Sequence, residues 1–431
     1  MTKLGVLFSV LGVGAGCIPA FAQKQLPNII VMLSDDQGWG DLGFTGNTFV
    51  QTPNIDRIAH EGTILENFYV CPVSSPTRAE FLTGRYHVRS GVNSTTGGGE
   101  RFNLGEKTIA EYFREAGYAT SLFGKWHSGT QYPYHPNARG FEEFYGFCSG
   151  HWGNYWNPVL EHNGEIISGE GFIIDDLTDK ALDYIRDHKE HPFFMFLSYN
   201  TPHSPMQVPD SWWNRVKDRT LSQRATFPEQ EDTTFTKAAL ALAENLDWNI
   251  GRVLSLLHSL DLEQETIVIY FSDNGPNSFR WNGGMKGRKG STDEGGVRSP
   301  FCIRWPGHIR KEAVETQLSG AIDLIPTLLG LAGIEYTPLR KLDGIDWGQR
   351  LLDEKAPAMD RVLYSYWGGK TSVRIPYYLL DAEGYLYKTD IDREQRKDVS
   401  DKEPEIYERM KRYSNCLLYT SPSPRDYAAS R

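Results

Sequence analysis

Four apolar runs share one pattern, because each leads directly into polar residues. They occupy positions 28–33, 119–123, 193–199 and 266–271. Near-continuous apolar runs of this length are typical of strands in a parallel sheet that is covered on both faces. Amphipathic helical patterns lie between and after them, at 54–61, 108–116, 177–186, 237–260 and 323–331. The alternation predicts an α/β fold, with a large mixed, mostly parallel sheet between helices.

The pattern changes from about Arg361. Short strand-like runs follow one another at 362–367, 371–374, 377–380 and 386–388, and turn signals separate some of them. A polar helical pattern near 403–412 comes next. We therefore expect a large α/β domain over 23–360 and a smaller C-terminal antiparallel-sheet subdomain over 361–415.

Residues 1–22 have the features of a signal peptide. Lys3 gives a positive start, an apolar run follows, and Ala20-Phe21-Ala22 forms a small-x-small cleavage site. The run is too short and too glycine-rich for a stable membrane span, and no other segment approaches about 20 apolar residues. We expect an exported protein, periplasmic or secreted, without a transmembrane segment. A lipid anchor on Cys17 is the alternative, but the branched aliphatic residue expected three positions earlier is missing.

Residues 416–431 have a different character. The run from Cys416 through Ser421-Pro422-Ser423-Pro424 to Asp426 resembles the translation of a sequencing-library adapter. The alternative is a flexible Ser/Pro-rich terminus. Under the adapter interpretation the natural C-terminus is missing, so no functional argument is based on this segment.

Composition excludes some classes of protein. The 431 residues are 39% hydrophobic and 23% charged, and 45 Lys+Arg against 55 Asp+Glu give a net charge of −10. A basic footprint for nucleic acid is therefore absent. The five cysteines form no C-x-x-C pattern, and we expect Cys71, Cys148 and Cys302 to be buried and unpaired.

Two of the polar clusters offer pairs of oxygen ligands. Asp35-Asp36 and Asp273-Asn274 each follow an apolar run. Because the carboxyl ends of parallel strands meet at one edge of a sheet, we expect the two pairs to converge there. Such oxygens suit a hard cation, calcium or magnesium. Either pair alone would be more common as a helix cap or turn, whereas both at one edge favour a metal site.

Other polar residues suggest that an oxyanion is bound at the same edge. Pro76 suits the first turn of a helix, which places Ser74 at the helix N-terminus, where backbone amides attract anions. Arg78 lies one turn further on, although this stretch could also be a simple capping sequence. The remaining cationic candidates follow strands or a Gly-rich turn and are Lys125, His127, His203 and Lys289. Together these groups could bind a tetrahedral oxyanion and protonate a leaving oxygen.

The ordered set of motifs resembles the formylglycine-dependent sulfatases of the alkaline-phosphatase superfamily. The family signature, C/S-x-P-S/T-R with an L-T-G-R end, is matched by Ser74 to Arg85 in its serine form. Further family blocks occur at 33–41, 124–127, 202–203, 272–275 and 289–298. The resemblance runs from about Pro27 to near Met410.

The resemblance implies a role for each matched residue. Ser74 would be oxidised to formylglycine, and one hydroxyl of the hydrated aldehyde would attack sulfur. The calcium ligands would be Asp35, Asp36, Asp273 and Asn274. Lys125, Lys289 and His203 would hold the sulfate, and His203 or Lys289 would protonate the leaving alcohol. His127 would take the proton from the second hydroxyl so that sulfate is expelled, and Arg78 would steady the hydrate.

The serine form has two further implications by resemblance. Serine-type precursors are converted by a radical S-adenosylmethionine maturase, which suggests a bacterial protein. Cys71 is not the converted residue, because in the motif the converted residue lies two positions before Pro and four before Arg. Ser74 has this spacing and Cys71 does not, so we interpret Cys71 as a small buried residue near the site.

The substrate is indicated only by an aromatic-rich stretch. Its members are Tyr132, Tyr134, His135, His151, Trp152, Tyr155 and Trp156, and Arg280 and Trp281 could line the same cleft. Aromatic faces pack on sugar rings, which favours a sulfated saccharide, but the same residues could form the core of a loop.

Two rival functions stay open. One is a phosphoester or phosphonate ester hydrolase, although one evident metal site and two lysines suit sulfate better. The other is a non-catalytic glycan-binding protein.

Overall fold

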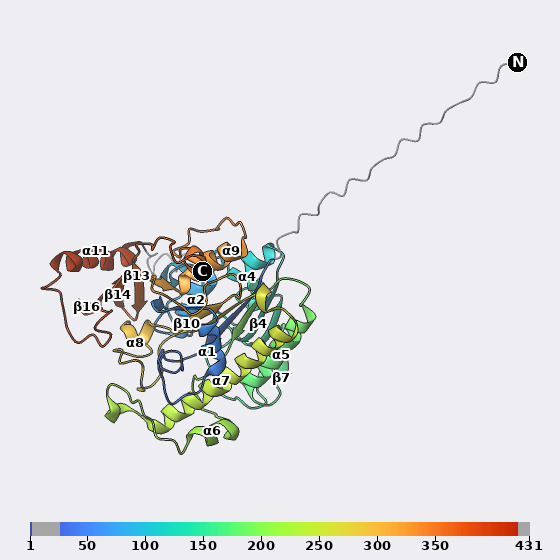
Figure 1. Cartoon of the computed structure of the whole chain (residues 1–431), viewed down its shortest axis with the longest axis horizontal. Coiled ribbons are helices and arrows are strands. Elements are labelled where there is room, and N and C mark those ends of the chain that lie inside the picture. The colour runs from blue at the N-terminus through green and yellow to red at the C-terminus, as the bar shows by residue number, and fades with distance from the viewer. Residues whose placement is uncertain (2–25, 421–431) are drawn as a thin grey trace.

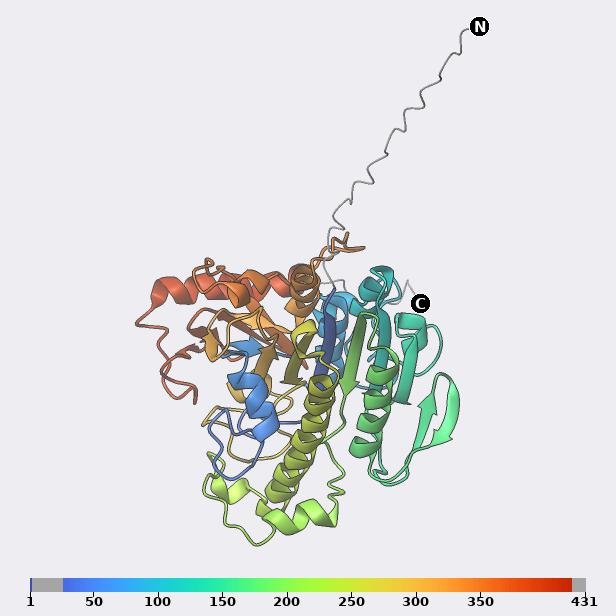
Figure 2. The ribbon, with the colours of Figure 1, turned by 45° about the vertical axis from the view of Figure 1, so that its right-hand side comes forward.

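The computed structural model describes Met1 and residues 26–420, with side chains as far as residue 414. One large sheet runs through the molecule, and helices lie on both sides of it (Figures 1 and 2). It has ten strands in the order β11-β2-β10-β9-β1-β8-β4-β5-β6-β7. Their bounds are β1 Asn28–Ser34, β2 Thr63–Leu65, β4 Ala119–Lys125, β5 Glu143–Phe147, β6 Val159–His162, β7 Glu165–Ser168, β8 Phe193–Ser198, β9 Thr266–Ser272, β10 Phe301–Arg304 and β11 Ala313–Glu315.

The four strands predicted from the apolar runs are neighbours at the centre of this sheet. β9, β1, β8 and β4 pair in parallel, and every residue of β1, β8 and β9 is buried. Successive side chains of β1 point to opposite faces. Val31 and Leu33 belong to the core on one face, and Ile30 and Met32 belong to the core on the other. The prediction of a mostly parallel sheet covered on both sides is confirmed.

The helices form two layers. On one face lie α1 (Pro53–His60), α5 (Ile173–Asp187) and α7 (Thr233–Ser259), and Figure 2 shows α5 and α7 lying along the sheet. On the other face lie α2 (Ser74–Thr83), α4 (Ile109–Glu115) and α9 (Leu324–Ala332). The shorter helices are α3 (His87–Ser90), α6 (Asp210–Val216), α8 (Glu294–Val297) and α10 (Gly348–Leu352). Short 3-10 turns occur at Pro136–Arg139, Pro228–Gln230, Glu263–Glu265 and Ala321–Asp323.

The sheet is wider than the apolar runs predicted. β10 pairs antiparallel with β9, and β2 and β11 extend that edge. At the other edge β5 pairs in parallel with β4, and an antiparallel hairpin of β6 and β7 follows. The hairpin turns at Asn163-Gly164, where both residues have positive φ, the pattern of a two-residue hairpin loop.

The smaller C-terminal sheet is present as expected. Its antiparallel strands are β13 (Leu363–Trp367), β14 (Lys370–Ile375), β15 (Tyr378–Leu380) and β16 (Leu386–Lys388). Helix α11 (Pro404–Thr420) packs beside β14 and β15, with Met410 in the shared core (Figure 1). A two-stranded element, β3 (Phe68–Tyr69) with β12 (Ser319–Gly320), lies outside the two larger sheets.

Some expectations concern the chain ends. The 1–22 segment and residues 421–431 lie outside the described residues, while 416–420 continue helix α11. Within residues 26–420 no helix combines the length and apolar character needed to cross a membrane.

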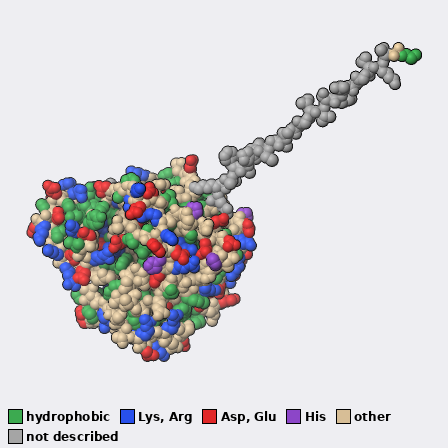
Figure 3. All heavy atoms as spheres, in the orientation of Figure 1, with side chains coloured by type: hydrophobic (Ala, Val, Ile, Leu, Met, Phe, Trp, Pro, Cys, Tyr) green, Lys and Arg blue, Asp and Glu red, His purple; other side chains and the backbone are tan. Residues whose placement is uncertain are grey.

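Cys71, Cys148 and Cys302 are buried and unpaired, as predicted. Acidic and basic side chains are interspersed over the face drawn in Figure 3.

Phe196 gives a direct test of how the sheet holds the α2 layer. It lies fully buried in β8, and its ring centroid is 4.9 Å from that of Phe81 on α2. We expect Phe196→Ala to lower the free energy of unfolding by about 3–5 kcal/mol, because it leaves a cavity between strand and helix. Urea unfolding followed by circular dichroism measures the change. The half-exposed Phe227→Ala is the control, expected within about 0.5 kcal/mol of the parent; equal effects would contradict the packing argument.

Candidate active site

The site lies where the central strands end. β1 ends at Ser34, β4 at Lys125, β8 at Ser198 and β9 at Ser272. These strands are adjacent and parallel, so the residues that follow them come together at one edge. Side chains from all four segments, together with the start of α2, make the contacts described below.

Ser74 stands at the start of α2 and is 3% exposed. The Nε of Arg78, one turn further along the helix, donates to Ser74 Oγ at 2.9 Å. His127 Nδ1 lies 3.1 Å from the same oxygen. The hydroxyl therefore has a cationic donor on one side and an imidazole nitrogen on the other.

His127 is held in the form that can accept a proton from Ser74. Its Nε2 lies 2.9 Å from the carbonyl oxygen of Thr95, and because a carbonyl can only accept, Nε2 carries the ring proton. Nδ1 then presents a lone pair to Ser74 Oγ. Burial and the nearby charge of Lys125 place the pKa of His127 well below its usual value, so the ring is neutral at pH 7.

Arg78 connects Ser74 to the strand ends. It is fully buried, and its Nη1 donates to the carbonyl of Lys125 at 2.9 Å and to Ser198 Oγ at 2.5 Å. Its Nη2 lies 3.3 Å from Asp273 Oδ2. A buried guanidinium needs such partners, and here they come from three different strand ends.

Two lysine–aspartate pairs lie beside this group. Lys125 Nζ is 2.6 Å from Asp35 Oδ2, and Lys289 Nζ is 2.6 Å from Asp36 Oδ1. Burial is the largest single influence and would raise the pKa of Asp35, but the charges of Lys125, His203 and Arg78 together outweigh it and the pKa is lowered. Burial likewise acts to lower the pKa of Lys289, but the charges of Asp36 and Asp35 raise it above its ordinary value.

His203 faces acceptors on both sides of its ring. Nδ1 lies 2.6 Å from the carbonyl of Ser204, and Nε2 lies 3.5 Å from Asp36 Oδ2. Because a carbonyl can only accept, Nδ1 carries a ring proton. Within the described residues Nε2 is left without a hydrogen bond, and it faces the edge of the carboxylate group.

The carboxylate group leaves oxygens free for a cation. Asp35 Oδ1, Asp36 Oδ2 and Asn274 Oδ1 are buried without a hydrogen-bond partner. Asp36 and Asp273 are joined through the backbone amide of Asp36, which donates to Asp273 Oδ1 at 3.1 Å. Buried oxygens of this type normally have partners, and carboxylate and amide oxygens are ligands for calcium. The residues present therefore fit a hard cation.

Asp41 and Arg280 contribute to this group in a way that the sequence did not indicate. Asp36 has a positive φ of 64°, an uncommon conformation for a residue with a side chain. Arg280 Nη2 donates to the Asp36 carbonyl at 2.9 Å and to Asp41 Oδ2 at 2.6 Å. Arg280 is only 4% exposed, so it supports the backbone of Asp36 from inside the protein and does not line a cleft. The occurrence of Asp41 in the 33–41 block was the one available signal.

The C-terminal sheet supports the loop that carries Lys289. Arg374 of β14 is buried, and it donates to the Thr292 carbonyl at 2.9 Å and to Glu294 Oε1 at 3.0 Å. Gln395 accepts from the amide of Glu294 at 3.0 Å and donates to Asp293 Oδ1 at 2.8 Å. Sequence patterns around these residues gave no indication of this role, because the contacts join segments far apart in the chain.

The aromatic-rich stretch divides into two groups. Tyr155 is 1% exposed, and its hydroxyl donates to the His203 carbonyl at 2.8 Å, so it supports the His203 segment from inside. The Trp152 ring stacks on Phe147. Tyr132 and Trp156 are exposed, at 80% and 46%. The His151 ring lies beside that of His203, with the two centroids 5.4 Å apart.

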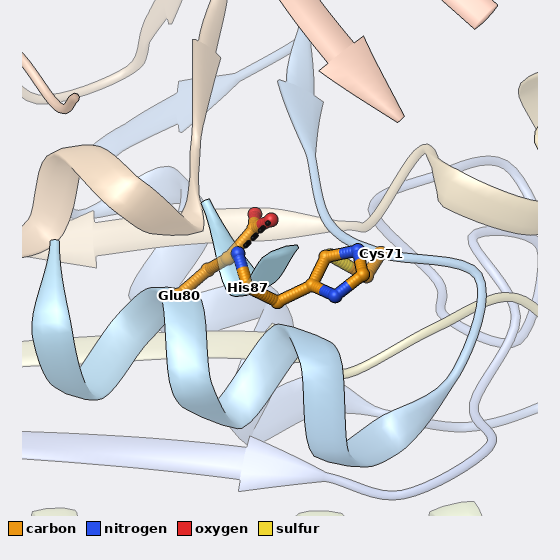
Figure 4. Close-up of side chains that lie close together, drawn as sticks. All are labelled: Cys71, Glu80 and His87. Atoms are coloured by element: carbon orange, nitrogen blue, oxygen red, sulfur yellow. Dashed lines mark hydrogen bonds between the residues drawn. The ribbon is translucent and has the colours of Figure 1, made fainter. Parts of the chain in front are cut away.

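Cys71 lies beside the ring of His87 (Figure 4). Its thiol shares a buried cluster with Glu80 and His87, and Glu80 accepts from the backbone amide of His87 at 3.2 Å. Burial, with the nearby Glu80, places the pKa of the Cys71 thiol well above its usual value, so it is protonated and a poor nucleophile. Ser74, not Cys71, contacts Arg78 and His127.

In a fold with helices on both sides of a mostly parallel sheet, ligands bind at the carboxyl edge, and the buried carboxylates and basic groups there suit a cation and a tetrahedral oxyanion, as in an ester hydrolase. The model of the sulfatase family matches residues 27–334. The chain belongs to the sulfatase family and is a sulfuric ester hydrolase.

Relatives of known structure or activity agree with this assignment. N-acetylgalactosamine-6-sulfatase of Mus musculus is 32% identical over an aligned length of 402 residues, and the alignment covers 85% of this chain and 72% of that protein. The crystal structure of Ps i-CgsB in complex with k-i-k-neocarrahexaose is similar with a TM-score of 0.83 and 29% identity, covering 93% of this chain and 94% of that one. The phosphonate monoester hydrolase of Agrobacterium radiobacter shares the fold, with a TM-score of 0.69 and 18% identity over 91% of this chain and 95% of that one.

Glu80 provides a prediction for pH dependence. Burial raises the pKa of its carboxyl to about 8 in the folded protein, from an ordinary 4.5. Between these values the folded chain binds more protons than the unfolded chain, so the free energy of unfolding falls as pH rises. Glu80→Gln keeps a neutral acceptor for the His87 amide, and we expect it to make the stability profile flatter between about pH 5 and pH 8. Urea unfolding at a series of pH values tests this, and profiles of equal slope would contradict it.

Proposed function

We propose that the chain removes sulfate from a sulfated carbohydrate, with Ser74 converted to formylglycine and one bound calcium ion. The observation that carries the proposal is the position of Ser74 Oγ between Arg78 Nε and His127 Nδ1, beside buried carboxylates with unpaired oxygens. Two relatives support the carbohydrate part of the proposal. One is named as an N-acetylgalactosamine-6-sulfatase, and the other was solved in complex with k-i-k-neocarrahexaose.

Asp35, Asp36, Asp273 and Asn274 would hold the cation, since three of them offer the unpaired oxygens and the fourth, Asp273, contacts Asp36. A bound calcium would supply charge that stabilises negative oxygens. The hydrate of formylglycine would supply a nucleophilic hydroxyl and a second hydroxyl from which the product can be released.

The protein groups then have distinct tasks. Lys125 and Lys289 bind and orient the sulfate oxygens. Asp35 and Asp36 hold the two ammonium groups next to the proposed cation site, where the sulfate would be bound. His203 gives a proton to the leaving alcohol from Nε2, because its Nδ1 proton is engaged by the Ser204 carbonyl. His127 accepts a proton at Nδ1 from the residue at position 74, because the Thr95 carbonyl fixes the tautomer. Arg78 holds that residue's oxygen in place.

The same proposal includes the conversion of Ser74 by a radical S-adenosylmethionine maturase and export directed by residues 1–22. It also includes a catalytic domain over 23–360 and a subdomain over 361–415. The serine form of the motif and the apolar start of the chain support them. Peptide mass measurement after co-expression with such a maturase should show position 74 lighter by two hydrogens.

Ser74→Ala tests the chemistry. We expect release of sulfate from a panel of sulfated saccharides to fall by more than about 10⁴-fold, because the group that attacks sulfur is removed. Ion chromatography measures the release, with a phosphorylated sugar run alongside. Ser75→Ala is the matched control, because Ser75 is buried next to Ser74 but its hydroxyl donates to the Ser94 carbonyl.

The outcomes separate the rival functions. Sulfate release by the parent that is lost only in Ser74→Ala supports the proposal. Phosphate release without sulfate release would favour a phosphoester hydrolase. Saccharide binding by a converted parent that releases neither ion would favour a glycan-binding protein.

Calcium removal tests the cation. Calcium is first removed by chelation and then added back. We expect the added calcium to raise the free energy of unfolding, by about 2.7 kcal/mol at a concentration one hundred times Kd, because only the folded chain assembles the ligands. The shift in thermal unfolding is the measurement, with magnesium as the comparison ion. Asn274→Ala removes one unpaired oxygen and should reduce the calcium-dependent shift. A shift unaltered in this variant would place the cation elsewhere.

A further inference from the structure

Arg288 differs from the basic residues closest to it along the chain. Lys289 pairs with Asp36, Arg280 pairs with Asp41, and Lys286 pairs with Asp293 and Asp381. Within the described part of the chain Arg288 has no acidic partner, and its side chain is exposed. In a protein with a net charge of −10, an arginine without a carboxylate partner next to the sulfate-binding lysine calls for a physical explanation.

The guanidinium of Arg288 is held in place despite its exposure. It lies 4.7 Å over the ring of Phe279, within the range of a cation–π contact. Its Nη1 donates to the carbonyl of Asn277 at 3.3 Å. A guanidinium has five N–H donors, so four remain for a ligand, and its orientation is already restricted.

The surrounding contacts place Arg288 at the rim of the active site. The backbone amide of Lys289 donates to the Pro276 carbonyl at 3.0 Å, and that of Gly290 donates to the Pro72 carbonyl at 2.8 Å. Asn277 also reaches the other side of the site, because its Nδ2 donates to Ser204 Oγ at 3.3 Å, next to His203. Arg288 therefore lies between the segment of the proposed proton donor and the segment of the proposed sulfate-binding lysine.

We propose that Arg288 forms an accessory subsite for a second oxyanion on the substrate, either a sulfate or a carboxylate on the saccharide. This inference rests on the proposed function and deepens it, because it makes the preferred substrate a polyanionic saccharide. The planar guanidinium fork pairs with two oxygens of such a group at once, and charge-assisted bonds of this type are among the stronger ones. The tetrahedral sulfate that is cleaved is bound separately, by Lys125 and Lys289.

The test compares substrate preference in Arg288→Gln and in the parent. The substrates are oligosaccharides of equal length that carry one sulfate, two sulfates, or one sulfate and one uronate. We expect the ratio of kcat/KM for the doubly charged over the singly charged substrate to fall by about tenfold in Arg288→Gln, mainly through KM. Arg288→Lys keeps the charge without the fork and should lie between the two.

The matched control is Arg114→Gln, which removes one exposed arginine on α4, away from the site residues, and should leave the ratio unchanged. The two doubly charged substrates separate a second sulfate from a carboxylate. An equal fall on singly and doubly charged substrates, or no fall at all, would overturn the subsite. Thermal unfolding verifies that each variant is folded.

A binding measurement separates this inference from the proposed function. Titration calorimetry on Ser74→Ala, with and without Arg288→Gln, reports affinity for the same saccharides without turnover. A loss of preference for the doubly charged saccharide supports the subsite even if the parent releases no sulfate, in which case only the proposed chemistry fails. Equal preference in both proteins overturns the subsite, whatever the result of the activity assay.

Discussion

Mutual neutralisation of buried charges is the constraint on which the site depends. Asp35, Asp36 and Asp273 are each at most 1% exposed, and Arg78 and Lys125 are equally buried. Transfer of each ion out of water costs several kcal/mol, and only close partners of opposite charge offset that cost. The positions of these groups are therefore linked, since a shift of any one leaves another without its counter-charge. The sheet satisfies this condition because adjacent parallel strands end at the same level.

The same constraint explains the unusual backbone at two positions. Asp36 and His127 both have positive φ, at 64° and 60°, and such conformations cost on the order of 1–3 kcal/mol each. At Asp36 the conformation is maintained from both sides, because its amide donates to Asp273 and its carbonyl accepts from Arg280. At His127 the amide donates to the Cys148 carbonyl at 3.2 Å, while the ring is fixed by Thr95. At both positions the positive φ turns the side chain toward the site, whereas a regular continuation of the strand would direct it elsewhere.

The sequence predicted the elements whose signal is local. The four central strands are continuous apolar runs, so burial on both faces was visible in the residues themselves. β2, β10 and β11 have only three or four residues, and the β6–β7 hairpin is largely exposed, so neither length nor hydrophobicity marked them. The Asn163-Gly164 turn was a signal for that hairpin. The candidate site residues could be predicted because they follow strands, lie in the first turns of a helix or, for Lys289, lie in a Gly-rich turn. Arg280 and the Thr95 carbonyl act through contacts that only the folded chain creates.

The C-terminal sheet illustrates how far such contacts extend. Glu294 on α8 is fully buried, and its carboxylate accepts from Arg374 of β14 and from the hydroxyl of Tyr69. Without strand β14 this carboxylate would lose a main counter-charge, Arg374, and the Thr292 carbonyl would lose both of its side-chain donors, Arg374 and Ser372. The loop between Asn282 and Glu294 would then keep only its other contacts, among them those with Pro72, Pro276 and Gln395. The position of Lys289 opposite Asp36 thus depends on a sheet that begins more than seventy residues later in the chain, and for this reason the two sheets form a single functional unit.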